Sequence, residues 1–209
     1  MKQNIIIKSL ILVASLAGLT AAARAADTAS SSGSLGLLGQ TYAGLSYSYI
    51  NLDSSPVNAE SYGFVYNQPL NTGFDAVFNY DWTQSGVVAG DRAHERALDA
   101  TLRAFSTTTA WGKPYIEAGV GYDWIKYAGA KDKSFNWIAG AGVEFQATSE
   151  LTITPFVRWL RATGYTDHNA VNYGVKANYW VTKQVGVLAS IDRSDDQDMT
   201  YKLGLNVRF

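Results

Sequence analysis

The sequence predicts an all-β protein folded as a membrane-spanning, up-and-down antiparallel β-barrel of ten strands, with eight strands as the alternative count. Three observations carry this prediction. Apolar and polar residues alternate with period two along most of the chain. The alternating segments are roughly twice as long as the five or six residues that are usual in strands of soluble proteins. Aromatic residues gather towards the segment ends, and glycine is frequent on the polar face.

The composition of the 209-residue chain fits this class. Aromatic residues make up 13% and charged residues only 17%, and 19 glycines stand beside two methionines, which favours strands over helices. With 47% apolar residues the chain can bury a substantial surface, which excludes wholesale disorder. The absence of cysteine excludes disulfides and cysteine-based metal sites, and the formal net charge of −1 argues against a dedicated nucleic-acid-binding protein.

The first 25 residues have the features of a secretory signal peptide. A positively charged start precedes an apolar stretch, and Ala23-Arg24-Ala25 supplies the small residues that precede a cleavage point. The apolar run of residues 10–23 is shorter than the roughly 20 residues that a spanning helix needs. We therefore expect residues 1–25 to be a cleaved signal peptide. Residues 26–39, rich in Ser, Gly and Ala, predict a flexible periplasmic lead.

Residues 40–209 predict ten strands, separated by turns rich in Gly, Pro, Asn, Asp and Ser. The last segment is the clearest, because its alternation continues without a break to the end of the chain. The fourth and ninth segments show the weakest pattern, and the count falls to eight if two weak segments are loops. The expected strands cover residues 40–52, 58–68, 72–84, 93–106, 113–127, 133–147, 150–163, 169–181, 184–193 and 197–209.

Alternation alone does not decide which face points outward, since a soluble lipocalin-like barrel has its apolar face inside and a membrane barrel has it outside. Glycines on the polar face favour the membrane barrel, because they make room for large neighbours in a narrow lumen. The centre of the apolar face carries no charge, and a lysine or arginine there would cost about 2–4 kcal/mol. The polar-face glycines are Gly44, Gly63, Gly73, Gly119, Gly121, Gly140, Gly142, Gly174, Gly186 and Gly204.

The aromatic residues of the apolar face predict two belts, which are typical of membrane barrels. An N-terminus on the periplasmic side places one belt at the outer end, with Tyr49, Tyr62, Tyr80, Trp82, Trp124, Trp137 and Trp159. The other belt contains Phe74, Phe145, Tyr179 and Phe209. The charges expected on this face are four cations of the outer rim and no acidic residue. These cations are Arg96, Lys126, Arg161 and Arg193.

The chain resembles the small bacterial outer-membrane β-barrels of the OmpA/OmpX-like, or porin-family, type over residues 40–209. Its ending is similar to the signal that the barrel-insertion machinery recognises, carried here by Tyr201, Leu203, Leu205, Val207 and Phe209. The resemblance implies the bacterial outer membrane as location. It also implies outer-membrane lipid or lipopolysaccharide, periplasmic chaperones and the barrel-assembly machinery as partners. We expect no periplasmic peptidoglycan-binding domain, so peptidoglycan anchoring is not among the expectations drawn from the resemblance.

Two interpretations of the inward face stay open: a salt-bridged plug with a structural role, or a narrow water-filled pore for small solutes or ions. Acidic residues outnumber basic ones on this face, which favours cations in a pore, and neutralising Glu117 and Glu144 should then reduce cation selectivity. The expected inward acids are Asp75, Asp81, Glu95, Asp99, Glu117, Asp123, Glu144 and Asp192. The expected inward bases are Arg103, Arg158, Lys176, Lys202 and Arg208.

The four outer-rim cations have two interpretations as well. They are placed to contact lipopolysaccharide phosphates, which arginine binds bidentately, or they simply extend towards water at the interface.

No catalytic, cofactor or metal site is expected. Asp167 and His168 are adjacent, and neighbours in an extended segment point to opposite faces, which makes them a poor acid–base pair. The chain also lacks a His-x-Ser sequence and the common hydrolase and phosphate-binding motifs. The alternatives are an omptin-like or lipid A-modifying barrel enzyme, and a soluble lipocalin-like binder.

Overall fold

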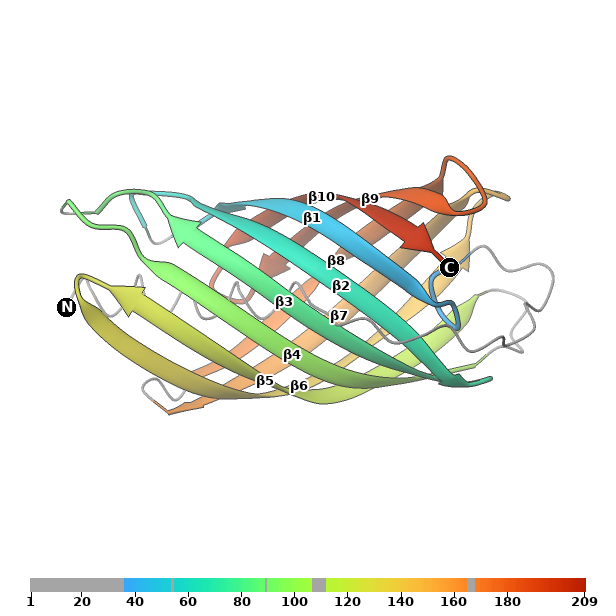
Figure 1. Cartoon of the computed structure of the whole chain (residues 1–209), viewed down its shortest axis with the longest axis horizontal. Helices are drawn as coiled ribbons and strands as arrows, with labels where there is room; N and C mark the ends of the chain where they lie inside the picture. The colour runs from blue at the N-terminus through green and yellow to red at the C-terminus, as the bar shows by residue number, and fades with distance from the viewer. Residues whose placement is uncertain (1–35, 54, 89, 107–111, 165–167) are drawn as a thin grey trace.

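Ten antiparallel strands run in chain order around a closed barrel in the computed structural model of the protein (Figure 1). Each strand pairs with the next along the chain, and β1 pairs with β10 to close the sheet. The structure describes residues 36–53, 55–88, 90–106, 112–164 and 168–209. The strands are β1 (Tyr42–Asn51), β2 (Ala59–Asn71), β3 (Phe74–Ser85), β4 (His94–Phe105), β5 (Lys113–Tyr127), β6 (Ala130–Gln146), β7 (Leu151–Gly164), β8 (His168–Trp180), β9 (Val185–Ser194) and β10 (Met199–Arg208).

The predicted fold and the count of ten strands are confirmed, including the fourth and ninth segments, whose sequence pattern is weakest. The largest differences in bounds are at the end of β2 and the start of β6. β6 begins earlier than expected because Ala128 and Gly129, with φ of 49° and 81°, form a two-residue turn after β5. β2 continues past Pro69, where its register with β3 shifts. Gly73 belongs to the turn before β3, so its expected place within a strand is wrong.

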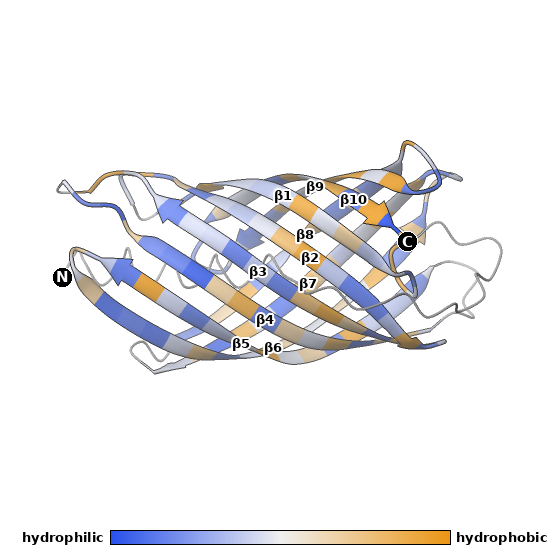
Figure 2. Ribbon diagram, in the orientation of Figure 1, coloured by the Kyte–Doolittle hydropathy of each residue, from blue (hydrophilic) through white to orange (hydrophobic). Residues whose placement is uncertain are grey.

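The distribution of side chains is the reverse of that in a soluble protein. Large apolar side chains such as Leu45, Ile116 and Leu203 are 64–65% exposed on the outer face, whereas Asp75 and Asp123 are fully buried on the inner face. Figure 2 shows the resulting alternation of hydropathy along the strands. An apolar exterior around a polar lumen is the arrangement of transmembrane barrels. No helix among the described residues is long and apolar enough to cross a membrane.

Aromatic side chains border this apolar exterior at both ends of the barrel. Near the outer ends of their strands, Tyr62 and Trp124 are 48% and 40% exposed, and Phe74 is 47% exposed at the inner end of β3. Trp137, expected in the outer belt, is the eighth of the seventeen residues of β6 and lies at mid-strand instead. Ring contacts link neighbours in the outer belt, since Tyr62 lies 5.5 Å from Tyr47 and 5.7 Å from Trp82 between ring centroids. Two aromatic belts enclose an apolar band, as expected for a barrel surrounded by lipid.

The outer face carries three charges that the sequence analysis did not place there. Glu60 lies on the same face of β2 as Tyr62, so the expectation of no acidic residue on this face is wrong. Glu60 is the second residue of β2, at the height where a charge reaches water. The early start of β6 also brings Lys131 and Lys133 onto the outer face, both exposed.

The strand glycines leave space for the charged side chains of the lumen. A Cβ at Gly63 would lie 2.6 Å from Asp81 Oδ1, and one at Gly140 would lie 3.0 Å from Glu117 Cγ. At Gly121 a Cβ would collide with Asp99 Oδ1. Since a contact under 3.0 Å requires a displacement, Gly63 and Gly121 leave the space that Asp81 and Asp99 occupy, and the contact at Gly140 is at this limit.

Candidate functional site

The structure places the side chains of all thirteen expected lumen charges on the inner face of the barrel. Eight of them are buried: Asp75, Asp81, Glu95, Asp99, Asp123, Glu144, Arg158 and Asp192. The other five are partly exposed to the interior: Arg103, Glu117, Lys176, Lys202 and Arg208. The lumen is therefore the main concentration of chemistry-bearing groups in the described chain.

Ion pairs join three strands through the middle of the lumen. Arg103 donates from Nε and Nη2 to Glu117 Oε2, at 3.1 and 2.8 Å, and connects β4 with β5. Arg158 Nη2 on β7 donates to Asp99 Oδ2 at 2.9 Å, and Arg158 Nε lies 3.9 Å from Glu117 Oε1. We call Asp99, Arg103, Glu117 and Arg158 the central network. It narrows the lumen and leaves nearby a cavity of about 100 Å³.

The outer half of the lumen is acidic. Asp81, Glu95, Asp123 and Asp192 lie towards the outer ends of their strands, and none of them makes an ion pair to another described residue. Asp123 Oδ2 accepts a hydrogen bond of 2.6 Å from Asn136 Nδ2. Both carboxylate oxygens of Glu95 are buried without a hydrogen-bond partner among the described residues. Lys202 lies in the outer half of β10, whereas Arg103 and Lys176 lie nearer the inner ends of their strands, as Asp75 and Glu144 do.

Residues 36–40 occupy the inner mouth of the barrel. Leu37 N–H donates to Glu144 Oε2 at 2.7 Å, and Gly39 N–H donates to Asp75 Oδ2 at 3.0 Å. Their carbonyl groups accept from the barrel wall: Gly36 from Arg208 at 3.0 Å, Leu38 from Lys113 at 3.3 Å and Gln40 from Asn67 at 2.8 Å. The side chain of Leu38 is buried at 3% exposure. We call residues 36–40 the inner plug.

The sequence analysis had assigned residues 36–39 to the flexible lead, and it missed these contacts. The only local signal is Gly39, which the plug holds at a φ of 76°. Residues 26–35 and the expected signal peptide of residues 1–25 lie outside the described residues.

The outer-rim cations Arg96, Lys126, Arg161 and Arg193 are all exposed on the outer face. Arg193 Nη2 donates to Gln197 Oε1 at 3.1 Å in the adjoining turn. In β10 and at the end of the chain, the residues of the predicted insertion signal are also exposed on the outer face. They are Tyr201, Leu203, Leu205, Val207 and Phe209.

The two histidines lie apart from each other. His94 is on the outer face of β4 and stacks on Trp82, with ring centroids 6.3 Å apart. His168 begins β8, and its Nε2 lies 3.5 Å from Asp196 Oδ2. Asp167, which precedes His168, lies outside the described residues. Among the described residues, no three His, Cys, Asp or Glu side chains are grouped so as to hold a metal ion.

Comparison with known proteins shows likeness in fold. No family model and no curated protein matches the sequence. The NanC porin has a TM-score of 0.53 and 12% identity, covering 80% of this chain and all of that one. The translocator domain of the autotransporter NalP from Neisseria meningitidis has a TM-score of 0.50 and 10% identity, covering 81% and 88%. The chain therefore has the fold of the bacterial outer-membrane β-barrels, as the resemblance implied.

Proposed function

We propose that the protein is a bacterial outer-membrane barrel that forms a narrow passive pore for small cations, closed at its inner mouth by the inner plug. The observation that carries the proposal is the group of unpaired carboxylates in the outer half of the lumen. The apolar band between two aromatic belts supports a location in lipid.

In the proposed pore, water enters the outer lumen and solvates its carboxylates. An ionised carboxylate buried without partners costs several kcal/mol, and Asp81, Glu95 and Asp123 have no cation within ion-pair distance among the described residues. Water that reaches these groups solvates them and opens a polar path from the outer end. Acidic groups around a narrow, hydrated path raise the local concentration of cations and exclude anions. The outer lumen is thus suited to admit cations.

The inner plug is suited to close this path reversibly. Backbone groups hold it by hydrogen bonds to Asp75, Glu144, Lys113, Arg208 and Asn67. A typical hydrogen bond contributes about 0.5–1.5 kcal/mol, and bonds to charged groups about twice that. Five such contacts can hold the plug in place, and none of them is covalent.

A structural barrel with a fixed interior is the second candidate. It is favoured by the central network, in which Arg158 bridges Asp99 and Glu117. In this alternative the interior charges stabilise the barrel, and no solute passes.

Conductance in a planar lipid bilayer distinguishes the two candidates. We would compare three refolded chains: residues 26–209, residues 36–209 and residues 41–209. The last chain lacks the plug, and the second is its matched control, because it is also shortened but keeps the plug. We expect rare small steps from the first two chains, and frequent cation-selective steps from residues 41–209.

Folding of each variant is checked by its faster migration on unheated gels. A folded and inserted chain of residues 41–209 that stays electrically silent contradicts the pore and supports the structural candidate. Frequent steps from all three chains would support the pore but would show that the inner plug does not close it.

The proposal includes no catalytic role for this barrel. A His168→Ala variant should therefore leave hydrolysis of peptide and lipid substrates at the level of an empty vesicle, like the parent protein. Hydrolysis by the parent that His168→Ala abolishes would favour the barrel-enzyme alternative instead.

A further inference from the structure

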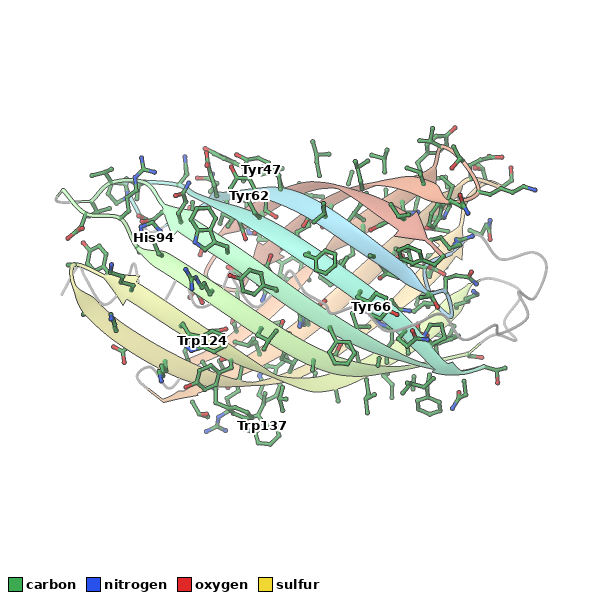
Figure 3. The ribbon with its side chains drawn as sticks, viewed as in Figure 1. Tyr47, Tyr62, Tyr66, His94, Trp124 and Trp137 are labelled. Carbon is green, nitrogen blue, oxygen red and sulfur yellow. The ribbon has the colours of Figure 1, made fainter. Side chains whose placement is uncertain are left out.

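Cations and tryptophans form one cluster on the outer face of β3–β6. In register across these strands, Arg96 lies between Trp82 and Trp124, and Lys133 follows Trp124. The next outward row places His94 beside Lys126 and Lys126 beside Lys131. We call this cluster the basic groove: Trp82, His94, Arg96, Trp124, Lys126, Lys131 and Lys133. Figure 3 shows His94 and Trp124 at the outer end of the barrel.

The surface at the cluster is hollowed. The seven residues of the basic groove, with Ile125 and Asp132, line a depression of about 1030 Å³. Among the described residues of this lining, Asp132 is the single acidic one, against three lysines and one arginine. The other two rim cations, Arg161 and Arg193, do not line it. The groove is therefore one localised site rather than an even ring around the barrel.

The groove cations have no anionic partner in the described part of the chain. Arg96, Lys126, Lys131 and Lys133 make no ion pair to another described residue. Lys126 and Lys131 stand directly opposite each other across β5 and β6, and like charges in this position destabilise a sheet. An anion bound between them would remove the repulsion. The site is complementary to a group that carries more than one negative charge.

Phosphate is the anion that fits this set of side chains. A guanidinium such as that of Arg96 binds phosphate oxygens through two parallel hydrogen bonds, and lysine ammonium groups add mobile point charges. Trp82 and Trp124 flank Arg96, and tryptophan prefers the interface between apolar chains and polar headgroups. The groove thus combines cations that can bind phosphate with two tryptophans suited to the membrane–water interface.

We propose that the basic groove binds the phosphorylated headgroup of a lipid in the outer leaflet. The face below it is apolar and exposed, with Leu98 and Leu102 on β4 and Val120 on β5. Acyl chains of a lipid bound at the groove would extend along this face, in the same apolar layer as the surrounding lipid. A free phosphate ion would gain nothing from that surface. The site does not depend on conduction through the lumen.

The test measures binding of diphosphoryl lipid A to the refolded protein in detergent by native mass spectrometry. The variant is Arg96→Gln/Lys126→Gln/Lys133→Gln, and the matched control is Arg161→Gln/Arg193→Gln. We expect at least a tenfold loss of bound lipid A in the groove variant, or about 1.4 kcal/mol, and less than a twofold loss in the control. Gel migration confirms that both variants are folded.

Two further measurements use the parent protein alone and so do not depend on the variants. The parent protein should bind dephosphorylated lipid A at least tenfold more weakly than the diphosphoryl form, and millimolar inorganic phosphate should leave the bound lipid in place. Equal losses in the groove variant and in its control would overturn the proposal, because they would indicate a belt-wide effect. Equal binding of both lipids, or displacement by inorganic phosphate, would also overturn it, the latter in favour of a free-phosphate site.

Discussion

Arg158 Nη2 on β7 donates a hydrogen bond of 2.9 Å to Asp99 Oδ2 on β4, and this contact joins strands that are not neighbours in the sheet. The two side chains are only 8% and 0% exposed. Glu117 approaches the same guanidinium at 3.9 Å and also accepts two hydrogen bonds from Arg103. The network thus balances two carboxylates with two guanidinium groups in the middle of the lumen.

Removal of Arg158 should destabilise the barrel more than removal of the whole pair. In Arg158→Met the Asp99 carboxylate stays buried without its partner, which should lower the free energy of unfolding by about 3 kcal/mol. The double variant Asp99→Asn/Arg158→Met should recover part of this loss, because no uncompensated charge remains. Urea unfolding in lipid vesicles measures these two variants and the single variant Asp99→Asn. If the double variant loses the sum of the two single losses, the side chains are not coupled.

Cation selectivity should depend on the outer carboxylates rather than on Glu117 and Glu144. Glu117 is neutralised by two arginines, and Glu144 stands at the inner mouth directly opposite Lys113 across β5 and β6. In the plug-free chain, Glu95→Gln combined with Asp81→Asn should lower the ratio of cation to anion permeability severalfold, since acidic groups set the selectivity of narrow pores. The reversal potential in a salt gradient reports this ratio.

Glu150→Gln is the control for selectivity, because Glu150 is exposed in the turn before β7 and outside the lumen. It should leave the reversal potential unchanged. Equal effects of the lumen and turn variants would show that general surface charge, and not the outer lumen, attracts cations.

Glycines of the lumen should differ in their tolerance of alanine. A Cβ at Gly119 would meet the Ala100 carbonyl and the Thr101 Cα, which are backbone atoms that cannot move aside. At Gly140 the contacts are longer, at 3.0 Å to the Glu117 side chain and 3.1 Å to the Val157 carbonyl oxygen. Gly119→Ala should therefore cost about 1–3 kcal/mol, and Gly140→Ala less than about 1 kcal/mol. Urea unfolding of both variants tests the order, and the reverse order would contradict this account.

Local pattern was sufficient to predict the strands and the direction of their side chains. Period two determines which residues share a face, so Asp81 and Glu95 could be assigned to the interior without knowledge of the register. The start of β6 was missed because Ala128 adopts a positive φ that few non-glycine residues adopt, and its sequence gives little signal of a turn.

The contacts that define the candidate site depend on how the barrel closes. Arg158 meets Asp99 because strand register and curvature bring β7 towards β4, and alternation within each strand contains neither quantity. The inner plug has no period at all, and backbone groups of Leu37 and Gly39 make its main contacts. A pattern of side-chain types cannot reveal contacts of that kind.

Asp198 links two outer loops at the place where β1 and β10 close the barrel. Its Oδ1 accepts a hydrogen bond of 2.9 Å from Asp53 N–H, which joins the turn before β10 to the connection after β1. Its own N–H donates to Ser194 Oγ at 3.1 Å. Burial raises the pKa of Asp198 to about 6, and the Asp53 N–H opposes this rise while the nearby Asp196 carboxylate adds to it.

Stability should accordingly fall as pH rises through the pKa of Asp198. The folded protein retains the proton up to about pH 6, whereas the ordinary value is 3.8, so the stabilisation is complete below the lower value and lost above the higher one. Asp198→Asn keeps an acceptor for Asp53 N–H and carries no charge. The variant should match the parent at about pH 4 and resist more urea than the parent at about pH 7.5. Asp195 is exposed in the same turn. Asp195→Asn should therefore leave the urea midpoint of unfolding unchanged at both pH values. If Asp198→Asn gives the same difference at both pH values, titration of Asp198 is not the cause.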